Sequence, residues 1–414
     1  MRAPRGALLL LWGCASRVEI AQAPQDVDAC EPLCVRLSGE PGASWRLAVG
    51  PLEASGALDE AGQAEACWEP PLPLGAWVAG LGDGPERPVR VRPFGWRYGL
   101  DRPVAPLGEL PWVPALEGLA DGPLLSPEEG RWDSLSVMAA SVTRFRGRHL
   151  LYYAGTDEED FHLGVAEEGA EGWVRLVDAP LLDPSSRPWR RFAQSTPEVE
   201  VVGDALWLWY TGRAREDGGL SIGLATSADG VVFTDHPDNP VLTGTGHPGD
   251  FDAGGVAHPS VVVRDGLFEL WYASGTLQVG HALSLDGVHW ERSCAGPVWT
   301  GDPDGWDGGQ VKAPEVWWDG ALYWMTYSGG GKGAYQVGWM ASADGTRWVD
   351  LGAPLLSPSS SAWATQATQE AYLEPDDQRI RLWYTGNDGV HQQIGAVWLE
   401  GVQAPPPASD GTSH

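Results

Sequence analysis

Short apolar strands alternate with glycine- and proline-rich breaks over most of the chain. The run from Leu206 to Tyr210 is apolar at every position, which is typical of a strand that is buried on both faces. Shorter strand-like runs occur upstream, at residues 34–37, 45–49, 77–81 and 89–91. The pattern predicts an all-β protein.

Between residues 111 and 400 one pattern recurs five times, at intervals of roughly 55 to 62 residues. Each copy starts with an aromatic residue about ten positions before an apolar strand, and a second strand then ends in tyrosine, small residues and glycine. The five aromatic residues are Trp132, Trp189, Phe251, Trp306 and Trp363. Because a repeat of this length suits four strands, the pattern predicts a five-bladed β-propeller.

Two further features complete the expected blades. Ser-x-Asp-Gly turns at Asp229, Asp286 and Asp344 predict tight hairpins between third and fourth strands, with the aspartates in a structural role. Proline followed by two apolar residues closes each fourth strand, and the first such copy precedes Trp132. We therefore expect residues 111–125 to supply the outer strand of blade five, which leaves no open sheet edge in the ring.

The fold expected is a five-bladed β-propeller that follows a small N-terminal β-sandwich-like domain. Residues 1–13 are assigned to a lipoprotein signal peptide, and residues 14–100 to the small β domain with its linker. Residues 101–401 form the predicted propeller, and residues 402–414, rich in Pro and Ser, are expected to be a disordered tail.

The N-terminus carries the pattern of an export signal. Arg2 and Arg5 precede a short apolar run over residues 7–12, as in the charged and hydrophobic regions of a signal peptide. Residues 11–14, Leu-Trp-Gly-Cys, resemble a bacterial lipobox apart from the tryptophan, and this resemblance implies acylation of Cys14. The alternative is cleavage after the small-x-small triplet at residues 21–23. We expect an exported protein of the cell envelope, anchored by lipid alone in the outer membrane or at the cell surface, or otherwise secreted.

Four cysteines remain after Cys14, and they are Cys30, Cys34, Cys67 and Cys294. In an oxidising compartment we expect one disulfide from Cys30 or Cys34 to Cys67. No paired spacing of cysteines and histidines suits a zinc site, so no metal or cofactor is expected.

Charge and aromatic content narrow the partners. With 56 acidic and 27 basic residues, the formal net charge is −29, which disfavours nucleic acid and anionic lipid surfaces as partners. The 23 tryptophans suit stacking on sugar rings, although packing between blades would also account for them. The expected partner is an oligo- or polysaccharide, and the sequence gives no indication of the oligomeric state.

The repeat resembles the five-bladed propellers of the glycoside hydrolase superfamily that includes arabinanases, β-xylosidases, invertases and levansucrases, in families 43 and 32. The resemblance rests on the order of the motifs, namely Tyr-x-Gly, Ser-x-Asp-Gly-x-x-Trp and Pro-Val-Leu, and it covers residues 111–400. It implies cleavage or transfer at a glycosidic bond in a funnel at the propeller axis, by one ionised and one protonated carboxyl group.

The resemblance places the catalytic carboxylates beside the proline that opens an inner strand. In this chain the two residues before that proline, or its equivalent, are 138–139, 195–196, 257–258, 312–313 and 369–370. Glu370 is the one carboxylate among them, so the family's pattern is incomplete. Further candidate catalytic residues are Asp133, Asp252 and Asp307, on loops that enter three inner strands. The alternative is that these aspartates cap the loops.

Residues that depart from the repeat in one blade are the better candidates for substrate binding, because a structural role should recur. These residues are Arg190, Gln194, His258 and Lys312. A ring of Arg190, His258 and Lys312 would suit an anionic sugar, and the alternative is that each pairs with a neighbouring acid or carbonyl group. Glu198 and Glu315 each follow the proline of an inner strand, and the sequence leaves the direction of their side chains open.

Three functions remain open from the sequence. A glycoside hydrolase requires two carboxyl groups that converge in the funnel. A non-catalytic glycan-binding propeller would keep aromatic and polar residues there without such a pair. A surface scaffold for other proteins would instead show a bare or plugged axis and an exposed apolar patch elsewhere.

Overall fold

The computed structural model describes residues 107–400 except 120, 158–159, 216–217, 294–295, 331–332 and 377–378. Before residue 107 it describes the strands between residues 18 and 92 and the turn at residues 59–61. The chain divides into two compact units, Met1–Pro106 with Ser293–Ala295, and Leu107–His414 without those three residues. The assignments made for residues 1–13 and 402–414 fall outside the described residues.

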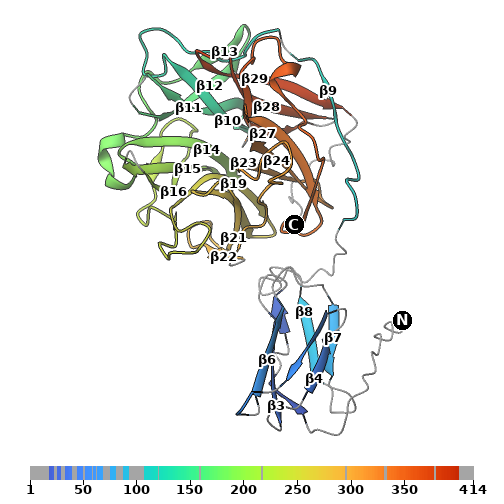
Figure 1. The fold of residues 1–414 in the computed structure, drawn as a ribbon. Coiled ribbons are helices and arrows are strands. Elements are labelled where there is room, and N and C mark those ends of the chain that lie inside the picture. The colour runs from blue at the N-terminus through green and yellow to red at the C-terminus, as the bar shows by residue number, and fades with distance from the viewer. Residues whose placement is uncertain are drawn as a thin grey trace, which may run out of the picture. The chain divides into compact units, whose positions relative to one another are not determined.

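The second unit is a five-bladed β-propeller, as the repeat predicts (Figure 1). Blade one contains β10 (Ser136–Phe145), β11 (Arg148–Thr156), β12 (His162–Gly169) and β13 (Gly172–Arg175). Blade two contains β14 (Ala193–Val202), β15 (Ala205–Arg215), β16 (Gly218–Ser227) and β17 (Thr234–Asp235), with β18 (Leu242–Thr243) also paired to β16. Blade three contains β19 (Val256–Arg264), β20 (Leu267–Ser274), β21 (Val279–Ser284) and β22 (Glu291–Arg292).

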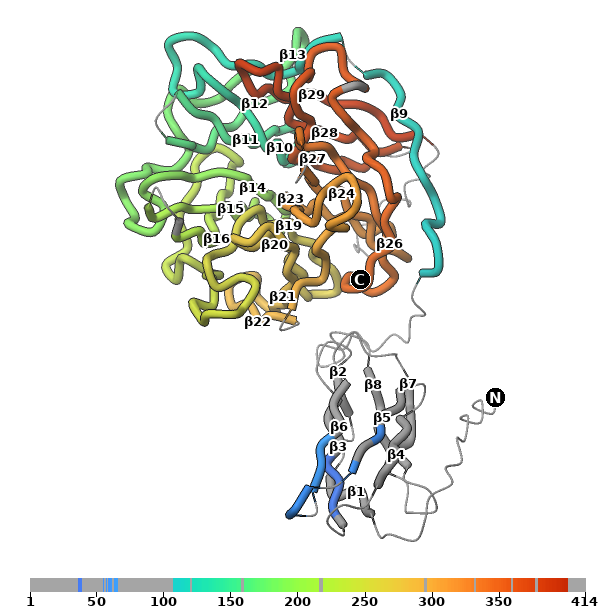
Figure 2. The backbone as a smooth tube through the Cα atoms, in the orientation of Figure 1, coloured from blue at the N-terminus to red at the C-terminus, as the bar shows by residue number. Residues whose placement is uncertain are grey.

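Blade four contains β23 (Val311–Trp318), β24 (Tyr323–Gly329), β25 (Gln336–Ser342) and β26 (Trp348–Asp350). Blade five contains β27 (Ala367–Pro375), β28 (Ile380–Asn387), β29 (Gln392–Glu400) and β9 (Ala115–Glu117). Three short 3₁₀ helices are described between the strands, η2 (Pro184–Ser186), η3 (Pro188–Arg190) and η4 (Pro358–Ser360). The first strands of the blades, β10, β14, β19, β23 and β27, meet around the propeller axis (Figure 2).

The ring closes between its two ends, as the order of the motifs predicts. Strand β9 pairs with β29, and Leu116 lies opposite Leu399 in this antiparallel register. Leu125, after the first proline of the repeat, adds an isolated bridge to Ile394. The segment that precedes blade one thus completes blade five, and the outer edge of β29 is paired.

The apolar residues of the strands pack between neighbouring blades. One buried cluster fills each of the five interfaces, including the interface between blades five and one. Trp209, Trp271, Trp339 and Trp383 are fully buried in these clusters or beside them. Much of the tryptophan content therefore belongs to the core of the propeller, where large aromatic rings bury the most apolar area.

The aromatic residue that starts each repeat packs on the tyrosine of the same blade. Trp132 stacks on Tyr153 with ring centroids 5.9 Å apart, and Trp363 stacks on Tyr384 at 5.5 Å. The glycine two residues after the tyrosine leaves room for this contact, because a Cβ at Gly386 would lie 2.3 Å from the ring of Trp363. The repeated signature therefore records a packing contact between the entering loop and the second strand.

The Ser-x-Asp-Gly turns are hairpins in which the aspartate binds the backbone. Asp229 Oδ1 accepts the N–H groups of Val231 and Val232, at 2.9 and 2.8 Å. Asp286 and Asp344 make the same pair of bonds to the residues two and three positions on. Their predicted structural role is confirmed.

The described strands of the first unit form two β-sheets. The three-stranded sheet contains β1 (Val18–Gln22), β3 (Leu33–Gly39) and β6 (Gln63–Trp68). The five-stranded sheet contains β2 (Asp26–Asp28), β8 (Arg87–Arg92), β7 (Gly75–Gly80), β4 (Ser44–Val49) and β5 (Leu52–Ala57). In the register of β3 and β6, Cys34 lies directly opposite Cys67. No helix in the described part of the chain is long and apolar enough to cross a bilayer.

Candidate active site at the propeller axis

Every inner strand carries a β-bulge at the same place. The pairing of β10 with β11 shifts between Met138 and Ser141, and equivalent shifts occur in β14, β19, β23 and β27. In each bulge one residue has a left-handed backbone with φ between 47° and 53°, and these residues are Ala139, Thr196, His258, Ala313 and Glu370. A left-handed conformation costs a residue other than glycine about 1–2 kcal/mol. Such strain is often found at functional sites, where a bulge redirects a side chain.

Hydroxyl groups from the preceding blade hold three of the bulges. Thr211 Oγ1 accepts the N–H of His258 at 2.9 Å, and Ser328 Oγ accepts the N–H of Glu370 at 2.8 Å. Thr385 Oγ1 accepts the N–H of Ala139 at 2.8 Å, across the closure of the ring. These hydroxyls belong to the small residue that follows tyrosine in the repeat, so the signature also supports the axis.

The bulges surround a pocket on the propeller axis. Its volume is about 320 Å³, counted with the part that is open to solvent. Each of the five inner strands contributes, and the lining residues are Ala139, Ala140, Thr196, Pro197, Glu198, His258, Pro259, Ala313, Pro314, Glu315, Glu370, Ala371 and Tyr372. The register expected from the prolines therefore does lead to the axis. Among the residues that the structure describes, no group of His, Cys, Asp and Glu suits a metal ion.

The residue one position after each proline, or its equivalent, binds the next blade. Ser141 Oγ accepts the N–H of Val199 at 3.0 Å, and Glu198 Oε1 accepts the N–H of Val261 at 2.8 Å. Ser260 does the same for blade four, and Glu315 for blade five. Tyr372 closes the circle with a hydrogen bond from its hydroxyl to a carbonyl of blade one, at 3.0 Å. Each inner strand has an unpaired edge at the axis, and these bonds satisfy part of it.

Glu198 and Glu315 are carboxyl groups with strongly altered acidity. Burial raises the pKa of Glu198 well above its usual range, and the nearby carboxyl groups of Glu315 and Glu200 add to the effect. Burial likewise raises the pKa of Glu315, against the opposing effect of the N–H of Leu373. Burial therefore favours the protonated form of both groups.

Glu370, the carboxylate found in the expected register, lines the pocket and is 7% exposed. Its Oε1 lies 3.2 Å from Lys312 Nζ, and its Oε2 accepts a hydrogen bond from Thr385 Oγ1 at 3.3 Å. The pocket thus contains an ion-paired carboxylate from β27 and two carboxyl groups, from β14 and β23, whose pKa values burial raises.

His258 lines the same pocket from blade three. Burial and, to a smaller extent, the positive charge of Lys312 lower the pKa of its imidazole to about 4, against the opposing effect of Glu370. The ring is therefore neutral at physiological pH. Its Nδ1 is buried and has no hydrogen-bond partner among the described residues.

Asp133, Asp252 and Asp307 are absent from the pocket lining and hold loops to their own blades. Asp133 accepts hydrogen bonds from the hydroxyl of Tyr153 at 2.8 Å and from Arg175 Nε at 2.7 Å. Asp252 binds a tyrosine and an arginine in the same way, at 2.9 and 2.6 Å. Asp307 accepts the hydroxyl of Tyr327 at 3.2 Å and two backbone N–H groups. These contacts favour the loop-capping interpretation.

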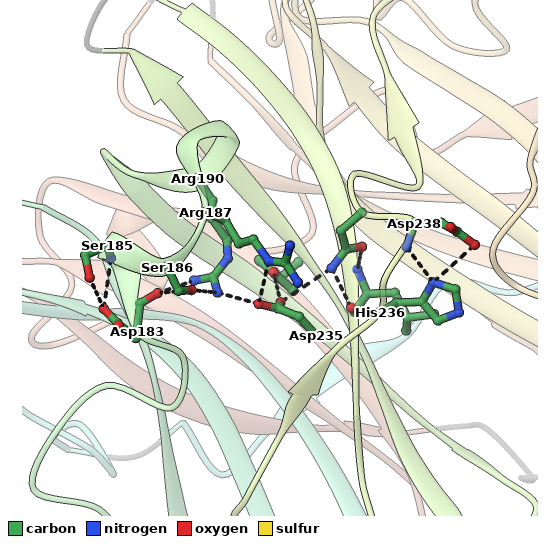
Figure 3. A network of polar contacts seen from close by, with 11 residues as sticks. Asp183, Ser185, Ser186, Arg187, Arg190, Asp235, His236 and Asp238 are labelled. Carbon is green, nitrogen blue, oxygen red and sulfur yellow. Dashed lines mark hydrogen bonds and ion pairs between the residues drawn. The ribbon is translucent and has the colours of Figure 1, made fainter.

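Arg190 also lies outside the pocket lining, and its guanidinium group is buried in blade two (Figure 3). It donates hydrogen bonds to Asp235 at 2.6 Å, to the carbonyl of Asp183 at 3.0 Å and to Ser186 Oγ at 2.9 Å. Asp235 also accepts the hydroxyl of Tyr210 at 2.8 Å. In blades one and three an aspartate of the entering loop pairs with an arginine of the fourth strand. In blade two the charges are exchanged, because the arginine lies in the loop and the aspartate in the fourth strand.

Gln194 is fully buried and is likewise not part of the pocket lining. Its backbone N–H binds the carbonyl of Phe161 at 2.8 Å, which ties blade two to blade one. Of the four predicted substrate-binding residues, His258 lines the pocket and Lys312 contacts a lining residue. The sequence did not lead us to select Thr196 or Tyr372, which also line the pocket. Their positions directly beside the inner-strand proline, or its equivalent, could have indicated them.

Comparison with known proteins gives a match in fold. No protein-family model matches the chain, and no curated protein matches it. A glycosyl hydrolase from Bacteroides ovatus aligns with a TM-score of 0.56 at 16% identity, over 70% of this chain and 97% of that chain. The chain has the fold of these propellers.

Two further solved structures agree. One, from a study of GH130 mannoside phosphorylases and glycoside hydrolases that target β-1,2-mannosidic linkages in Candida mannan, has a TM-score of 0.55 at 16% identity over 72% of this chain and 98% of that chain. The other, a thermostable family-43 glycoside hydrolase, has a TM-score of 0.50 at 16% identity over 68% and 98%. The resemblance expected from the motifs is confirmed for the propeller fold, and activity has to be argued from the pocket.

Proposed function

We propose that this protein is a carbohydrate-active propeller that binds a glycan in the axial pocket and cleaves its glycosidic bond. The observation that carries the proposal is the pocket lining itself, which brings the ion-paired Glu370 together with Glu198 and Glu315, whose pKa values burial raises. Hydrolysis of a glycosidic bond needs one ionised carboxylate and one protonated carboxylic acid, and a raised pKa favours the second form. The fold of the solved glycoside hydrolases supports the same conclusion.

In the proposed reaction Glu370 acts as the ionised carboxylate. It takes a proton from a water molecule, the water oxygen attacks the anomeric carbon, and the bond to the leaving oxygen breaks. Glu198 or Glu315 gives its proton to that leaving oxygen. His258, which is neutral, is assigned to hydrogen bonding with a sugar hydroxyl.

The charges in and beside the pocket favour a neutral sugar over an anionic one. Lys312 is paired with Glu370, Arg190 is paired with Asp235, and the low pKa of His258 leaves its ring uncharged. Neither Lys312 nor Arg190 is therefore left unpaired to bind an acidic group, and His258 carries no charge that could do so. We propose a neutral oligo- or polysaccharide as the substrate.

The proposal is tested by measuring sugar release from a panel of neutral and acidic plant and microbial glycans by the Cys14→Ser variant of the chain. Glu370→Gln should abolish sugar release without lowering the melting temperature, while the matched control Glu167→Gln, at a partly exposed ion pair, should retain it. Glu198→Gln and Glu315→Gln in parallel identify the proton donor. Asp307→Asn should act by unfolding, with a lower melting temperature. Undiminished release by Glu370→Gln would contradict the assignment.

One observation favours a second candidate, a non-catalytic glycan-binding propeller. Four of the five bulge positions lack a carboxylate, and the fifth, Glu370, is neutralised by Lys312. In that case calorimetry would detect glycan binding by the wild-type protein, no glycan would be cleaved, and binding would survive Glu370→Gln.

We also propose that the protein is exported and anchored to the cell envelope through a lipid on Cys14. Strand β1 supports cleavage before Cys14, because cleavage after residue 23 would remove Val18–Gln22, which pairs with β3. We propose Cys34 as the partner of Cys67 in a disulfide, and the register of β3 and β6, in which the two residues lie opposite each other, supports this. Mass spectrometry of protein recovered from envelopes tests both points, through acyl chains on Cys14 and a linked Cys34–Cys67 peptide.

A further inference from the structure

Lys312 occupies a position that is unlike its equivalents in the other blades. It stands two residues before Pro314, where the other inner strands carry methionine, serine, alanine and glutamine. Its ammonium group contacts Glu370 of blade five at 3.2 Å and lies over the ring of Tyr335, 4.4 Å from the ring centroid. The Lys312 side chain is 16% exposed, so solvent screens these contacts only partly.

The contacts of Lys312 leave it little capacity for a charged ligand. The ammonium group lies over the aromatic ring, which attracts a cation, and it also contacts the carboxylate. Tyr335 is itself held in place, because the N–H of Thr368 donates a hydrogen bond to its carbonyl at 3.0 Å. A lysine held in this way can fix a neighbouring group in place.

We propose that Lys312 is a positioning residue: held over Tyr335, it fixes the carboxylate of Glu370 at the axial pocket and does not itself bind the substrate. This inference rests on the proposed function and adds a role to the same site. The charged and titratable groups that face Lys312 are Glu370 from β27, His258 from β19 and Tyr335 before β25, and Glu315 follows on its own strand.

The coupling between Lys312 and His258 gives a test that needs no enzyme activity. The positive charge of Lys312 lowers the pKa of His258, and Glu370 raises it. Removing the charge should therefore raise the pKa of His258 from about 4 by about one unit. NMR titration of the imidazole measures this, with the signal assigned by its loss in His258→Asn.

Four variants of the Cys14→Ser chain are compared. Lys312→Met should raise the pKa of His258, Lys312→Arg should leave it near the wild-type value, and Tyr335→Leu should shift it by freeing the ammonium. The control Arg146→Met, on an exposed hairpin of blade one, should not change it. In hydrolysis, Lys312→Met should lower kcat at least tenfold with little change in KM, and Lys312→Arg should restore kcat.

The outcomes separate this inference from the proposed function. An unchanged pKa of His258 in Lys312→Met would overturn the positioning role, as would a loss confined to KM, which would make Lys312 a substrate ligand. If the wild-type protein neither cleaves nor binds any glycan of the panel, the proposed function fails. The titration then still tests, without enzyme activity, whether the ammonium group of Lys312 lies where the structure places it.

Discussion

At the propeller axis, Glu198 and Glu315 do in blades two and four what Ser141 and Ser260 do in blades one and three. Each accepts a backbone N–H of the next blade, so these glutamates serve the fold as well as the pocket. Glutamate at these positions adds a carboxyl group whose protonated form burial favours. The same carboxyl group can therefore close the ring and remain available as an acid.

This dual role predicts how stability depends on pH. A buried carboxyl group with a raised pKa stabilises the folded state fully below the pKa of the unfolded chain, near 4.3, and loses that contribution as pH rises towards the folded pKa. Glu198→Gln resembles the protonated acid and cannot ionise. Above about pH 4.3 its free energy of unfolding should therefore fall less steeply with rising pH than that of the wild-type protein.

Denaturant unfolding at several pH values measures the slope, with Glu167→Gln, at a partly exposed position, as the control. Parallel slopes for Glu198→Gln and the wild-type protein would show that the carboxyl group of Glu198 ionises freely in the folded state.

At the scale of the elements, the contact between the entering loop and the second strand recurs in four blades with the same glycine. A Cβ at Gly155, Gly212, Gly329 or Gly386 would lie within 2.5 Å of the loop residues that pack there. Blade three differs, because its signature has an extra residue and Gly275 meets no atom closer than 3.5 Å. The glycine is therefore a packing requirement of the blade, and it holds the inner strand that carries the pocket.

Gly386→Ala should destabilise the propeller by about 1–3 kcal/mol, because the new methyl group overlaps Trp363 in a packed interior. Gly122→Ala, where no atom lies within 4 Å of the added Cβ, is the matched control and should leave stability nearly unchanged. Thermal unfolding of the three proteins measures the difference. Equal melting temperatures for Gly386→Ala and Gly122→Ala would show that the loop moves aside at no cost.

At the scale of the whole molecule, the interface between blades one and five contains a histidine between two carboxylates. His149 Nδ1 lies 2.7 Å from Glu168 in blade one, and its Nε2 lies 2.7 Å from Glu374 in blade five. Burial would lower the pKa of His149, yet the hydrogen bonds to Glu374 and Glu168 leave it raised overall. Hydrogen bonding to His149 holds the pKa of Glu374 below its usual range against burial. The contacts of His149 with the two carboxylates therefore join blades one and five in addition to the pairing of β9 with β29.

These shifts predict a window of pH in which the closure is strongest. The contribution of His149 is full below about pH 6.5 and is lost as pH rises through its raised pKa. The contribution of Glu374 is lost as pH falls below about 4.5. His149→Gln should therefore lower the melting temperature by a few degrees at pH 5.5 and by less at pH 8.5. A difference that is equal at both pH values would contradict the ion pair.

Much of this architecture could be predicted from the sequence. The spacing of the repeat indicates five blades. The first fourth-strand motif comes before the first blade, which indicates that the segment before blade one closes the ring. The prolines mark where the inner strands reach the axis. These features are local, because each depends on residues that lie within one blade or on the order of the blades.

The choice among the carboxylates and cations depended on the tertiary structure. Asp133 and Glu370 are both polar residues near the start of an inner strand, and only the left-handed bulge directs Glu370 to the pocket while Asp133 turns to Tyr153 and Arg175. Arg190 departs from the repeat because Asp235, 45 residues away in sequence, carries the opposite charge. The sequence by itself determined the fold and the register of the site, since these follow from local periodicity. Which side chains share the pocket was decided by contacts between residues far apart in the chain, which local patterns do not encode.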